Sequence, residues 1–594
     1  MSPLELLVKT EFFADLAPAA QSDLEDAIRL RRVPAGAALI EQGAAGDALY
    51  VLRHGRLRVE LAETHGPSTV LAEISVGELF GEMAMLVGDR RATTVRAVRE
   101  SEVIELSRAA FDTLAASHPE LLRRLATLLA QRLRAANHRT PRGRVFGTVA
   151  LVRHRPSVDL RGFSEQLAAA LRPYRAARVV TIDDALGGPG LDDAGLRERV
   201  LPWLAVQEAE GSTLLLVTDP DADAWTRFAL AQADVVLVVA DGTDTPPPGR
   251  VEAGLRETSI AARELVLLYA PSAQPEGTAA WLAGGRFARH HHLRRDDRGD
   301  LRRLARWLAG KSLGVAFGGG GARGFAHIGL VRAFAEAGLE IDRVGGTSMG
   351  SIIAAQVALG WTWPTMLDRT REAFREDPLK NDNTLPLVSL ITGKRVVKLV
   401  QSLFGTLRAE DAWLPHFAML CNLSRAEPIV RRQGPLWQMV RASSALPGIG
   451  PPVIENGDFI VDGAIFNNVP ADVLLDDAAG PVVAVNVSPR DDLRTSLPDN
   501  YAMSGWDLLW NRMRGVKGAA EYPSMLAVVQ RAVLLHSIAE SERLGQRASL
   551  YVHPRLDQFD MFAWQRIDEI STVGYTEGRD ALAAWVRTLG TRTT

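Results

Sequence analysis

Two glycine-rich turns, each between a predicted strand and a predicted helix, constrain the fold of this chain most strongly. The segment 313–356 contains an apolar strand, the glycines 318–321, a helix, a second strand, the tight turn 346–350 and a second helix. This order is typical of a parallel α/β sheet, in which such turns lie at the carboxyl ends of the strands, where these sheets bind their ligands. We therefore expect an α/β domain with its functional site at both turns.

Ser348 lies at the centre of the second turn, in the pattern G-x-S-x-G. Small residues on both sides of a serine allow the sharp nucleophile elbow that exposes its hydroxyl group. The pattern alone has little specificity, because glycine and serine are common residues. A glycine loop in the preceding strand-to-helix turn adds specificity, and Ser348 is therefore the predicted nucleophile.

The first turn contains Gly319, Gly320 and Gly321, followed closely by Arg323. Consecutive amides without side chains, next to a helix N-terminus and a guanidinium, can stabilise a developing oxyanion. The same glycines also fit the dinucleotide-binding pattern G-x-G-x-x-G. The elbow serine in the next turn and the lack of an acidic residue at the end of the second strand favour an oxyanion hole.

Asp462 ends an apolar strand-like run before a Gly-Ala turn and is the predicted general base. A buried carboxylate at such a position can have a raised pKa and accept the serine proton. A triad histidine would be the usual alternative, but no histidine lies in a comparable motif. Structural roles are predicted for the four histidines considered: His327, His416, His536 and His553.

The motifs GGGARG, GTSMG and DGA, in this order, resemble those of patatin-like phospholipases over about residues 311–590. The resemblance implies a Ser348–Asp462 dyad without histidine, an oxyanion hole formed by the glycine-loop amides with support from Arg323, and no metal ion or catalytic cofactor. Segments such as HIGLVRAFAEAG and DGAIFNNVPADV are similar to the neuropathy target esterase branch. This similarity implies hydrolysis of lysophospholipids and related esters.

Residues 39–106 contain short apolar runs separated by turns, which predicts a small all-β barrel or roll. Helical apolar spacing from 107 to about 137 predicts one helix, which either packs on the roll or forms the seam of a homodimer. The runs GAAGD, ALYVLRHG and GELFGEMA resemble a cyclic-nucleotide-binding domain. An alternative is a roll that no longer binds nucleotide and serves as an interaction surface.

The same resemblance implies a phosphate cassette in GELFGEMA and the arginine that follows it. Arg91 would bind the cyclic phosphate and Glu82 the ribose hydroxyl. Ala92 occupies a position where many cGMP-selective domains have threonine, which favours cAMP over cGMP, and Arg90 replaces the usual proline. The candidate nucleotide-binding residues are Gly81, Glu82, Arg91, Ala92 and Thr93.

Between residues 145 and 310, five strand-like runs alternate with helical stretches, which predicts a parallel α/β domain. This segment resembles the linker region of the same esterase branch and has no G-x-x-x-x-G-K-[ST] loop, so we assign it no chemistry. His290, His291 and His292 lie in an arginine-rich stretch. Because adjacent histidines rarely converge on one ion, we expect a solvated linker there.

A chain of 594 residues is too long for one hydrophobic core. We expect a multidomain protein: a cyclic-nucleotide-binding-type β-roll with helices at 1–138, a middle α/β domain at 139–310 and an α/β patatin-like hydrolase domain at 311–594. With 68 basic and 71 acidic residues, no overall field attracts nucleic acid.

A single cysteine, Cys421, excludes an intrachain disulfide and a cysteine metal cluster. No run reaches the roughly 18 apolar residues of a membrane span, and the N-terminus does not resemble a secretion signal. We expect a cytoplasmic protein that contacts a membrane peripherally.

The sequence thus predicts a serine esterase or lysophospholipase that cleaves acyl esters through an acyl-enzyme, with cAMP or cGMP as an effector. An alternative is a catalytically silent scaffold at the membrane that responds to cyclic nucleotide. A transcription regulator would need a basic recognition helix after residue 138, where strands follow instead.

Overall fold

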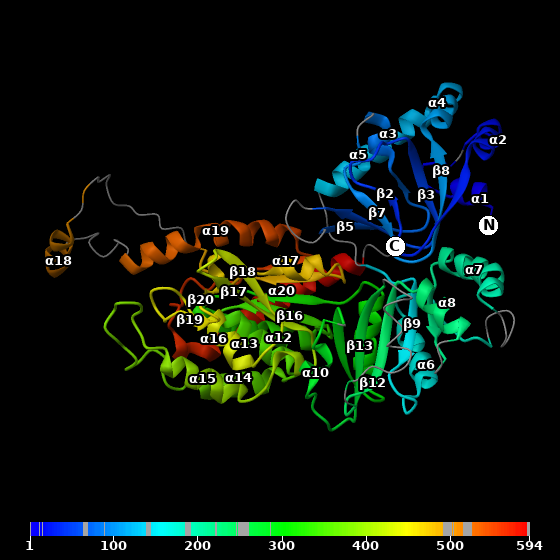
Figure 1. The fold of residues 1–594 in the computed structure, drawn as a ribbon. Helices are drawn as coiled ribbons and strands as arrows, with labels where there is room; N and C mark the ends of the chain where they lie inside the picture. The colour runs from blue at the N-terminus through cyan, green and yellow to red at the C-terminus, as the bar shows by residue number, and fades with distance from the viewer. Residues whose placement is uncertain are drawn as a thin grey trace. The chain divides into compact units, whose positions relative to one another are not determined.

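The structure is a computed structural model, and it forms two compact units (Figure 1). It describes residues 2–590 except 11, 15, 63–68, 88–89, 138–143, 184–191, 220–222, 245, 247–260, 286, 491–501, 503 and 515–524. The first unit consists of Met1–Arg139, Arg144–Glu276 and Ala280–Gly310. The second consists of the described residues from Lys311 onwards together with the short piece Gly277–Ala279.

The first unit begins with a roll of two four-stranded antiparallel sheets, as predicted. One sheet has the order β1 (Arg29–Val33), β8 (Ser101–Ser107), β3 (Ala48–His54), β6 (Leu79–Phe80). The other has the order β2 (Ala38–Ile40), β7 (Thr94–Ala97), β4 (Leu57–Leu61), β5 (Thr69–Ile74). Side chains alternate along β3: Tyr50 and Leu52 belong to the core of the roll, whereas Leu49 and Val51 pack with the flanking helices.

Helices α1 (Pro3–Leu7), α2 (Pro18–Ala27), α3 (Glu82–Val87), α4 (Arg108–Ser117) and α5 (Glu120–Asn137) accompany the roll. The prediction of a single helix from 107 to 137 was wrong, because the helix is interrupted at His118 and Pro119. Proline has no amide proton and disfavours helical backbone in the residue before it. Leu121 and Leu125 of α5 are buried in the cluster between the roll and its helices, so part of the leucine stripe packs on the roll.

The rest of the first unit is a six-stranded parallel sheet in the order β10-β11-β9-β12-β13-β14. Its strands are β9 (Thr148–Arg153), β10 (Ala177–Val180), β11 (Thr213–Val217), β12 (Val235–Asp241), β13 (Ala262–Tyr269) and β14 (Arg289–Arg294). Its helices are α6 (Leu160–Leu171), α7 (Asp193–Ala209), α8 (Ala224–Gln232) and α11 (Arg298–Leu308), and the short α10 (Thr278–Leu282) precedes β14. The predicted parallel α/β domain is therefore present.

The solvated linker expected around His290, His291 and His292 is wrong, because these residues form part of β14. His291 and His292 are buried, and a ring nitrogen of His291 lies 2.9 Å from the Glu264 carboxylate. Pairing with β13 satisfies the backbone hydrogen-bonding groups of this charged segment. A histidine ring can be buried when its nitrogen atoms are hydrogen-bonded. Within the described part of the chain, no cluster of His, Cys, Asp or Glu could hold a metal ion.

A buried ion cluster joins the roll to the parallel sheet inside the first unit. Arg99, in the turn after β7, donates to Glu208 at 2.7 Å and lies 3.1 Å from the Asp234 carboxylate. Arg99 also donates to the backbone carbonyl of Gln232 at 2.9 Å. All three ionised side chains are almost fully buried, so their charges depend on one another for compensation.

The second unit is built on an eight-stranded mixed sheet in the order β19-β20-β17-β16-β15-β21-β22, with β18 also paired to β17. The strands are β15 (Gly314–Phe317), β16 (Arg343–Thr347), β17 (His416–Asn422), β18 (Glu427–Arg431), β19 (Val453–Glu455), β20 (Asp458–Asp462), β21 (Val482–Val485) and β22 (Leu550–Val552). β15, β16, β17, β21 and β22 are parallel, whereas β18 and β20 pair with β17 in the antiparallel direction.

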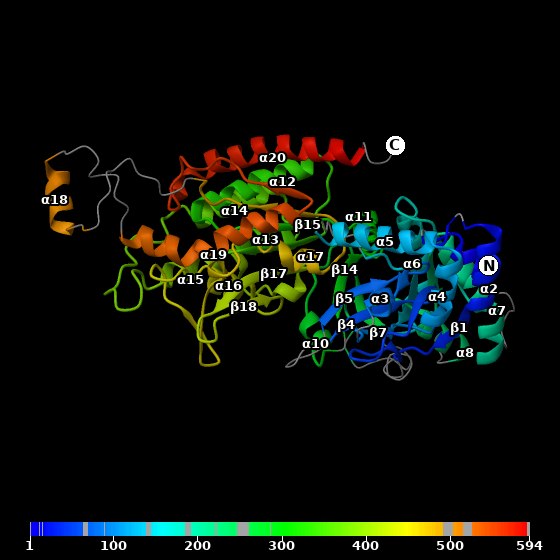
Figure 2. The same cartoon turned by 90° about the horizontal axis from the view of Figure 1, so that it is seen from above.

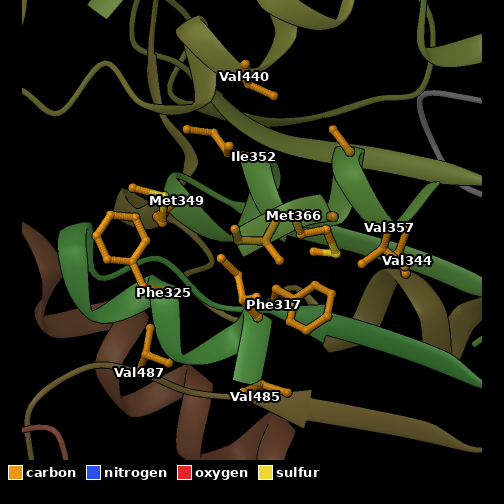
Figure 3. Close-up of a cluster of buried hydrophobic side chains, with 14 of the residues drawn as sticks. Phe317, Phe325, Val344, Met349, Ile352, Val357, Met366, Val440, Val485 and Val487 are labelled. Atoms are coloured by element: carbon orange, nitrogen blue, oxygen red, sulfur yellow. The ribbon is translucent and has the colours of Figure 1, made fainter. Parts of the chain in front are cut away.

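Alternating side chains of this sheet bury both of its faces. Phe317 and Val485 belong to the cluster that contains α12 (Ala326–Glu336) and α13 (Met349–Ala358), drawn in Figure 3. Their neighbours Ala316 and Ala484 belong to a second cluster, with α17 (Ala471–Asp476) and Leu544 of α19 (Met525–Arg547). The result is a three-layer arrangement.

The remaining helices of this unit are α14 (Trp363–Ala373), α15 (Lys394–Phe404), α16 (Leu436–Ser443), α18 (Gly505–Met513) and α20 (Ile567–Gly590). α20 lies alongside α12 (Figure 2). A side chain at Gly329 would meet the Ser571 carbonyl oxygen at 1.8 Å, and one at Gly574 would meet the Ala326 carbonyl oxygen at 2.0 Å. This close packing fixes the helix that begins directly after the glycine loop. Of the described helices, none is long and apolar enough to cross a membrane.

Candidate active site

Ser348 lies at the sharp turn between β16 and α13, with φ 53° and ψ −125°. This conformation is unfavourable for a residue with a side chain and persists only where its surroundings enforce it. A side chain at Gly346 would meet the carbonyl oxygen of Gly350 at 2.4 Å, and one at Gly350 would meet the carbonyl oxygen of Phe317 at 2.2 Å. Both glycines of the pattern are therefore required by the turn that exposes Ser348.

Two contacts from distant segments hold this turn. The amide of Ser348 donates to the hydroxyl of Ser443 at 2.9 Å, and that hydroxyl donates to the Met419 carbonyl at 2.8 Å. The hydroxyl of Thr347 donates to the Asn467 carbonyl at 2.9 Å. Sequence reasoning missed Ser443, although it lies in the segment LWQMVRASSALPG, which resembles the esterase branch.

Asp462 ends β20 and is only 1% exposed. Burial raises the pKa of its carboxyl to about 7, against the opposing effect of hydrogen bonds from the Ala464 amide and the Ser348 side chain. The Ala464 amide donates to Asp462 at 2.9 Å. The structure thus brings together Ser348 and Asp462, which are far apart in the sequence, and gives the carboxylate a proton affinity suited to general-base catalysis near neutral pH.

The glycine loop passes directly beside the elbow. A Cβ at Gly319 would lie 3.0 Å from the Cβ of Ser348. The Gly319 amide, however, already donates to the side-chain oxygen of Asn468 at 3.1 Å. Gly320 and Gly321 follow, and within the described residues no protein acceptor bonds their amides. These two amides are the loop donors available to an oxyanion.

Arg323 connects the glycine loop to the segment before α20. Its Nε donates to the Phe559 carbonyl at 2.8 Å, and the amide of Ala322 donates to the Met561 carbonyl at 2.8 Å. Gly321 has φ 59°, and a side chain there would meet the same Met561 oxygen at 2.3 Å. Arg323 therefore has a positioning contact in this loop.

The histidines of this unit make other contacts. The Nε2 of His327 donates to the Gly318 carbonyl at 2.8 Å, and burial lowers the pKa of His327 to about 4. Burial also lowers the pKa of His416 to about 3. His553 lies 2.8 Å from the Ser488 carbonyl. Within the described part of the chain, no histidine hydrogen-bonds to Ser348 or Asp462.

An apolar pocket opens beside Ser348, with a cavity volume of about 110 Å³. Aliphatic and aromatic side chains from several helices form most of its wall. Its lining includes Met349, Ile352, Phe374, Leu379, Ile391, Val396, Leu399, Val400, Leu446, Ile449, Met561, Phe562 and Trp564. A pocket with such an apolar lining is suited to an acyl chain.

Among the candidate nucleotide-binding residues of the roll, a direct hydrogen bond joins Arg91 and Gly81. Arg91 donates to the Gly81 carbonyl at 2.6 Å and to the Ala48 carbonyl at 2.8 Å. Glu82 is buried at the start of α3. Ala92 is exposed and Thr93 is partly buried, and both lie directly before β7.

Three family models match the chain. A cyclic nucleotide-binding domain matches residues 30–118, a neuropathy target esterase family P-loop-like domain matches residues 145–307, and a patatin-like phospholipase model matches residues 315–475. The last match includes Ser348 and Asp462. The middle match falls on the parallel sheet of the first unit.

Curated relatives match nearly the whole chain. Neuropathy target esterase sws of Drosophila melanogaster is 30% identical over 92% of this chain and 42% of its own length. Patatin-like phospholipase domain-containing protein 6 of Homo sapiens is 31% identical over 95% of this chain and 45% of its own length. The chain thus spans less than half the length of these relatives. The solved Thermus thermophilus catabolite activator protein is 26% identical over 34% of this chain and 88% of its own, with a TM-score of 0.21.

Proposed function

We propose that this chain, which is similar to patatin-like phospholipases and to the neuropathy target esterase family, hydrolyses acyl esters of lysophospholipids and related lipids. The observation that carries this proposal is the pairing of Ser348 with Asp462 beside an apolar pocket. The carboxyl is buried and accepts a hydrogen bond from the serine side chain.

In the first half of the reaction, the ionised Asp462 accepts the hydroxyl proton of Ser348 as its oxygen attacks the acyl carbonyl carbon. The amides of Gly320 and Gly321 stabilise the resulting oxyanion. Gly319 contributes by holding the loop in place through Asn468 rather than by donating its amide. The tetrahedral species collapses, and the leaving alcohol takes the proton from Asp462.

In the second half, Asp462 accepts a proton from water, and the hydroxide attacks the acyl-enzyme ester on Ser348. The second tetrahedral species releases a fatty acid, and the serine oxygen regains its proton from Asp462. Every proton moves between Asp462, Ser348, water and the substrate oxygens, so the cycle requires no metal ion or cofactor.

We also propose that the protein works at a membrane surface as a peripheral protein. Its substrates carry long acyl chains, and the apolar pocket beside Ser348 opens to solvent. A lipid that passes directly from a bilayer into such a pocket avoids exposing its chain to water.

The roll supplies the regulatory part of the proposal, with cAMP as the preferred effector. Arg91 contacts Gly81, and Glu82 begins the adjacent helix, so a guanidinium for a cyclic phosphate and a carboxylate for a ribose hydroxyl lie in neighbouring segments. The phosphate would replace a carbonyl bond of Arg91, because this side chain donates to Gly81 and Ala48.

The test is fatty-acid release from lysophosphatidylcholine by the purified full chain and by Ser348→Ala and Asp462→Asn. We expect both variants to lose activity by about 10³-fold or more. Asp458→Asn, at the other end of β20, is the matched control and should retain activity. An active Ser348→Ala variant would show that Ser348 is not the nucleophile, whereas a wild type that cleaves no acyl ester would favour the catalytically silent scaffold.

A further inference from the structure

Arg441 of α16 is the single charged residue among the twenty that line the pocket beside Ser348. The residue is 7% exposed. One of its terminal nitrogens donates to the Pro451 carbonyl at 3.1 Å, and its Nε has no hydrogen-bond partner in the described part of the chain. A guanidinium has five N–H donors, so one hydrogen bond to the protein leaves most of the bonding capacity of Arg441 unused.

Among the described residues, the hydrogen bond of this cation goes to a carbonyl and not to a carboxylate. The nearest electrostatic partner is Asp382, which opposes the lowering of the Arg441 pKa by burial. The Asp382 carboxylate instead accepts hydrogen bonds from the Gly393 amide, at 2.8 Å, and from the Thr392 hydroxyl. A buried charge without a partner is costly, so its presence in a substrate pocket points to an anionic ligand.

The surrounding backbone is shaped to hold this guanidinium. Gly393 has φ 76°, and a side chain there would lie 2.8 Å from a terminal nitrogen of Arg441 and 3.2 Å from the ring of Pro451. Glycine at this position therefore leaves room for the guanidinium, while the Pro451 carbonyl fixes its direction. The side chain is positioned before any ligand binds, which lowers the entropic cost of recognition.

We propose that Arg441 binds the phosphate of the lipid headgroup while the acyl ester lies against Ser348. This assignment rests on the esterase function proposed above and adds substrate selection to it. Charge-assisted N–H···O bonds from a guanidinium to phosphate are strong, and a pocket with apolar walls strengthens them. An acylglycerol without phosphate would leave Arg441 unpaired, so the pocket should discriminate against it.

The test uses ether analogues, which contain no cleavable ester, so that binding is measured apart from hydrolysis. We expect the full-length wild type to bind an alkyl lysophosphatidylcholine at least about tenfold more tightly than the alkylglycerol with the same chain. Arg441→Met should lose this preference and keep its affinity for the alkylglycerol. Arg441→Lys should retain part of the preference, and Arg543→Met, an exposed arginine of α19, should leave it unchanged.

A wild type without phosphate preference overturns the assignment, even if Arg441→Met does not fold. Equal loss of both ligands in Arg441→Met also overturns it, because that result indicates a structural role. If Arg441 is needed for binding free fatty acid and the protein does not bind glycerophosphocholine, Arg441 binds the carboxylate of the product instead of the phosphate. If the protein prefers the phosphate ligand but cleaves no ester, the Arg441 assignment stands and the proposed esterase function is wrong.

A second, independent feature is an exposed apolar loop next to the same pocket. Leu385, Leu387 and Val388 are 72%, 83% and 69% exposed. The loop leaves the pocket wall after Leu379 and returns to it at Ile391, and both of these residues line the pocket. Its tip therefore continues the apolar surface of the pocket towards solvent.

The base of this loop is held by hydrogen bonds. The amide of Ile391 donates to the Ile449 carbonyl at 3.1 Å, and the amide of Thr392 donates to the Asp382 carbonyl at 2.7 Å. Ser389 is buried, and its hydroxyl donates to the Ile391 carbonyl at 2.8 Å. With the base fixed, the tip side chains remain directed to the outside.

Three exposed lysines lie before and after the tip along the chain: Lys380, Lys394 and Lys398. Within the described residues none of them forms an ion pair. We infer that the tip at 385–388 inserts into a bilayer and that the lysines contact anionic headgroups. Apolar side chains with lysines before and after them match the apolar interior and negative surface of such a membrane.

Co-sedimentation of the full chain with phosphatidylcholine vesicles, with and without phosphatidylserine, tests this surface. The triple variant Leu385→Ser, Leu387→Ser, Val388→Ser should bind vesicles about tenfold more weakly and still hydrolyse a soluble short-chain ester. Replacing the three lysines with glutamine should remove the dependence on phosphatidylserine. Val70→Ser with Leu71→Ser, two exposed residues of the roll, is the control. Unchanged binding by the tip variant, or a tip-dependent dimer, would overturn the inference.

Discussion

Asn468 holds Gly319 through both of its backbone groups. The side-chain oxygen of Asn468 accepts from the Gly319 amide at 3.1 Å, and its nitrogen donates to the Gly319 carbonyl at 3.1 Å. The same nitrogen donates to the Ser488 hydroxyl at 3.0 Å. This side chain therefore fixes the position of the glycine loop relative to the turn at Ser348, although it contacts no reacting atom in the proposed mechanism.

Replacing Asn468 with alanine should lower kcat by about tenfold to a hundredfold with little change in KM, because the oxyanion donors that follow Gly319 are misplaced. Steady-state hydrolysis of a soluble ester checks this. Asn467→Ala is the matched control, since its side chain bonds Asp472 and not the loop. A larger effect on KM than on kcat would contradict a positioning role.

The pKa of Asp462, raised by burial to about 7, sets the expected pH dependence. Only the ionised carboxylate accepts a proton, so kcat/KM should rise through about pH 7 and then level off. The free energy of unfolding depends on pH in the opposite direction. The raised pKa of Asp462 favours the folded state at a pH below the unfolded pKa of about 4, and this contribution is lost as the pH rises through 7. Asp462→Asn should therefore increase the free energy of unfolding of the second unit above pH 7, by up to about 4 kcal/mol. At pH 4 the same substitution should not increase it.

Ser443→Ala should leave the buried amide of Ser348 without its acceptor. An unpaired buried donor costs about 1–3 kcal/mol, and the elbow should lose part of its fixed geometry. We expect a lower melting temperature together with a lower kcat. Ser444→Ala removes the neighbouring hydroxyl, which in the described part of the chain donates to the Val440 carbonyl of α16, and should affect both quantities much less.

Arg99→Met should destabilise the first unit by about 3 kcal/mol, because Glu208 and Asp234 each lose a buried cationic partner while Arg56 still lies 3.4 Å from Asp234. Thermal or urea unfolding monitored in this unit measures the effect. Arg31→Met is the control, since its exposed ion pair with Glu105 should contribute less than about 1 kcal/mol. Equal effects of the two substitutions would show that the buried cluster does not stabilise this unit.

Arg91→Ala and Glu82→Gln should abolish cAMP binding measured by titration calorimetry, and Ala92→Thr should raise the affinity for cGMP relative to cAMP. Arg91→Ala and Glu82→Gln remove polar partners of the cyclic phosphate and the ribose, whereas Ala92→Thr adds a hydroxyl where many cGMP-selective domains have threonine. Arg90→Ala, next to the candidate site, is the control. A wild type that binds neither nucleotide would favour the roll as an interaction surface.

Features that depend on steric contacts of the local backbone could be predicted from the sequence. The spacing of glycines around Ser348 follows from the turn itself, since side chains at 346 and 350 would collide with neighbouring backbone. The parallel α/β character and the roll were predicted from apolar periodicity, which reflects the alternation of side chains along a strand. Pro119 was also a readable signal for the end of a helix, and it was overlooked.

Longer-range relationships were decided only by the tertiary structure. Asn468 meets Gly319 and Ser443 meets Ser348 across about 149 and 95 residues, and no local pattern marks such pairs. Burial of His291 in β14 overrode the polar character of its segment, because strand pairing and Glu264 satisfy its polar groups. The sequence by itself determined the chemistry of the elbow, the glycine loop and the apolar layers. Only the fold decided which distant side chains hold them and which charge, that of Arg441, is left facing the pocket.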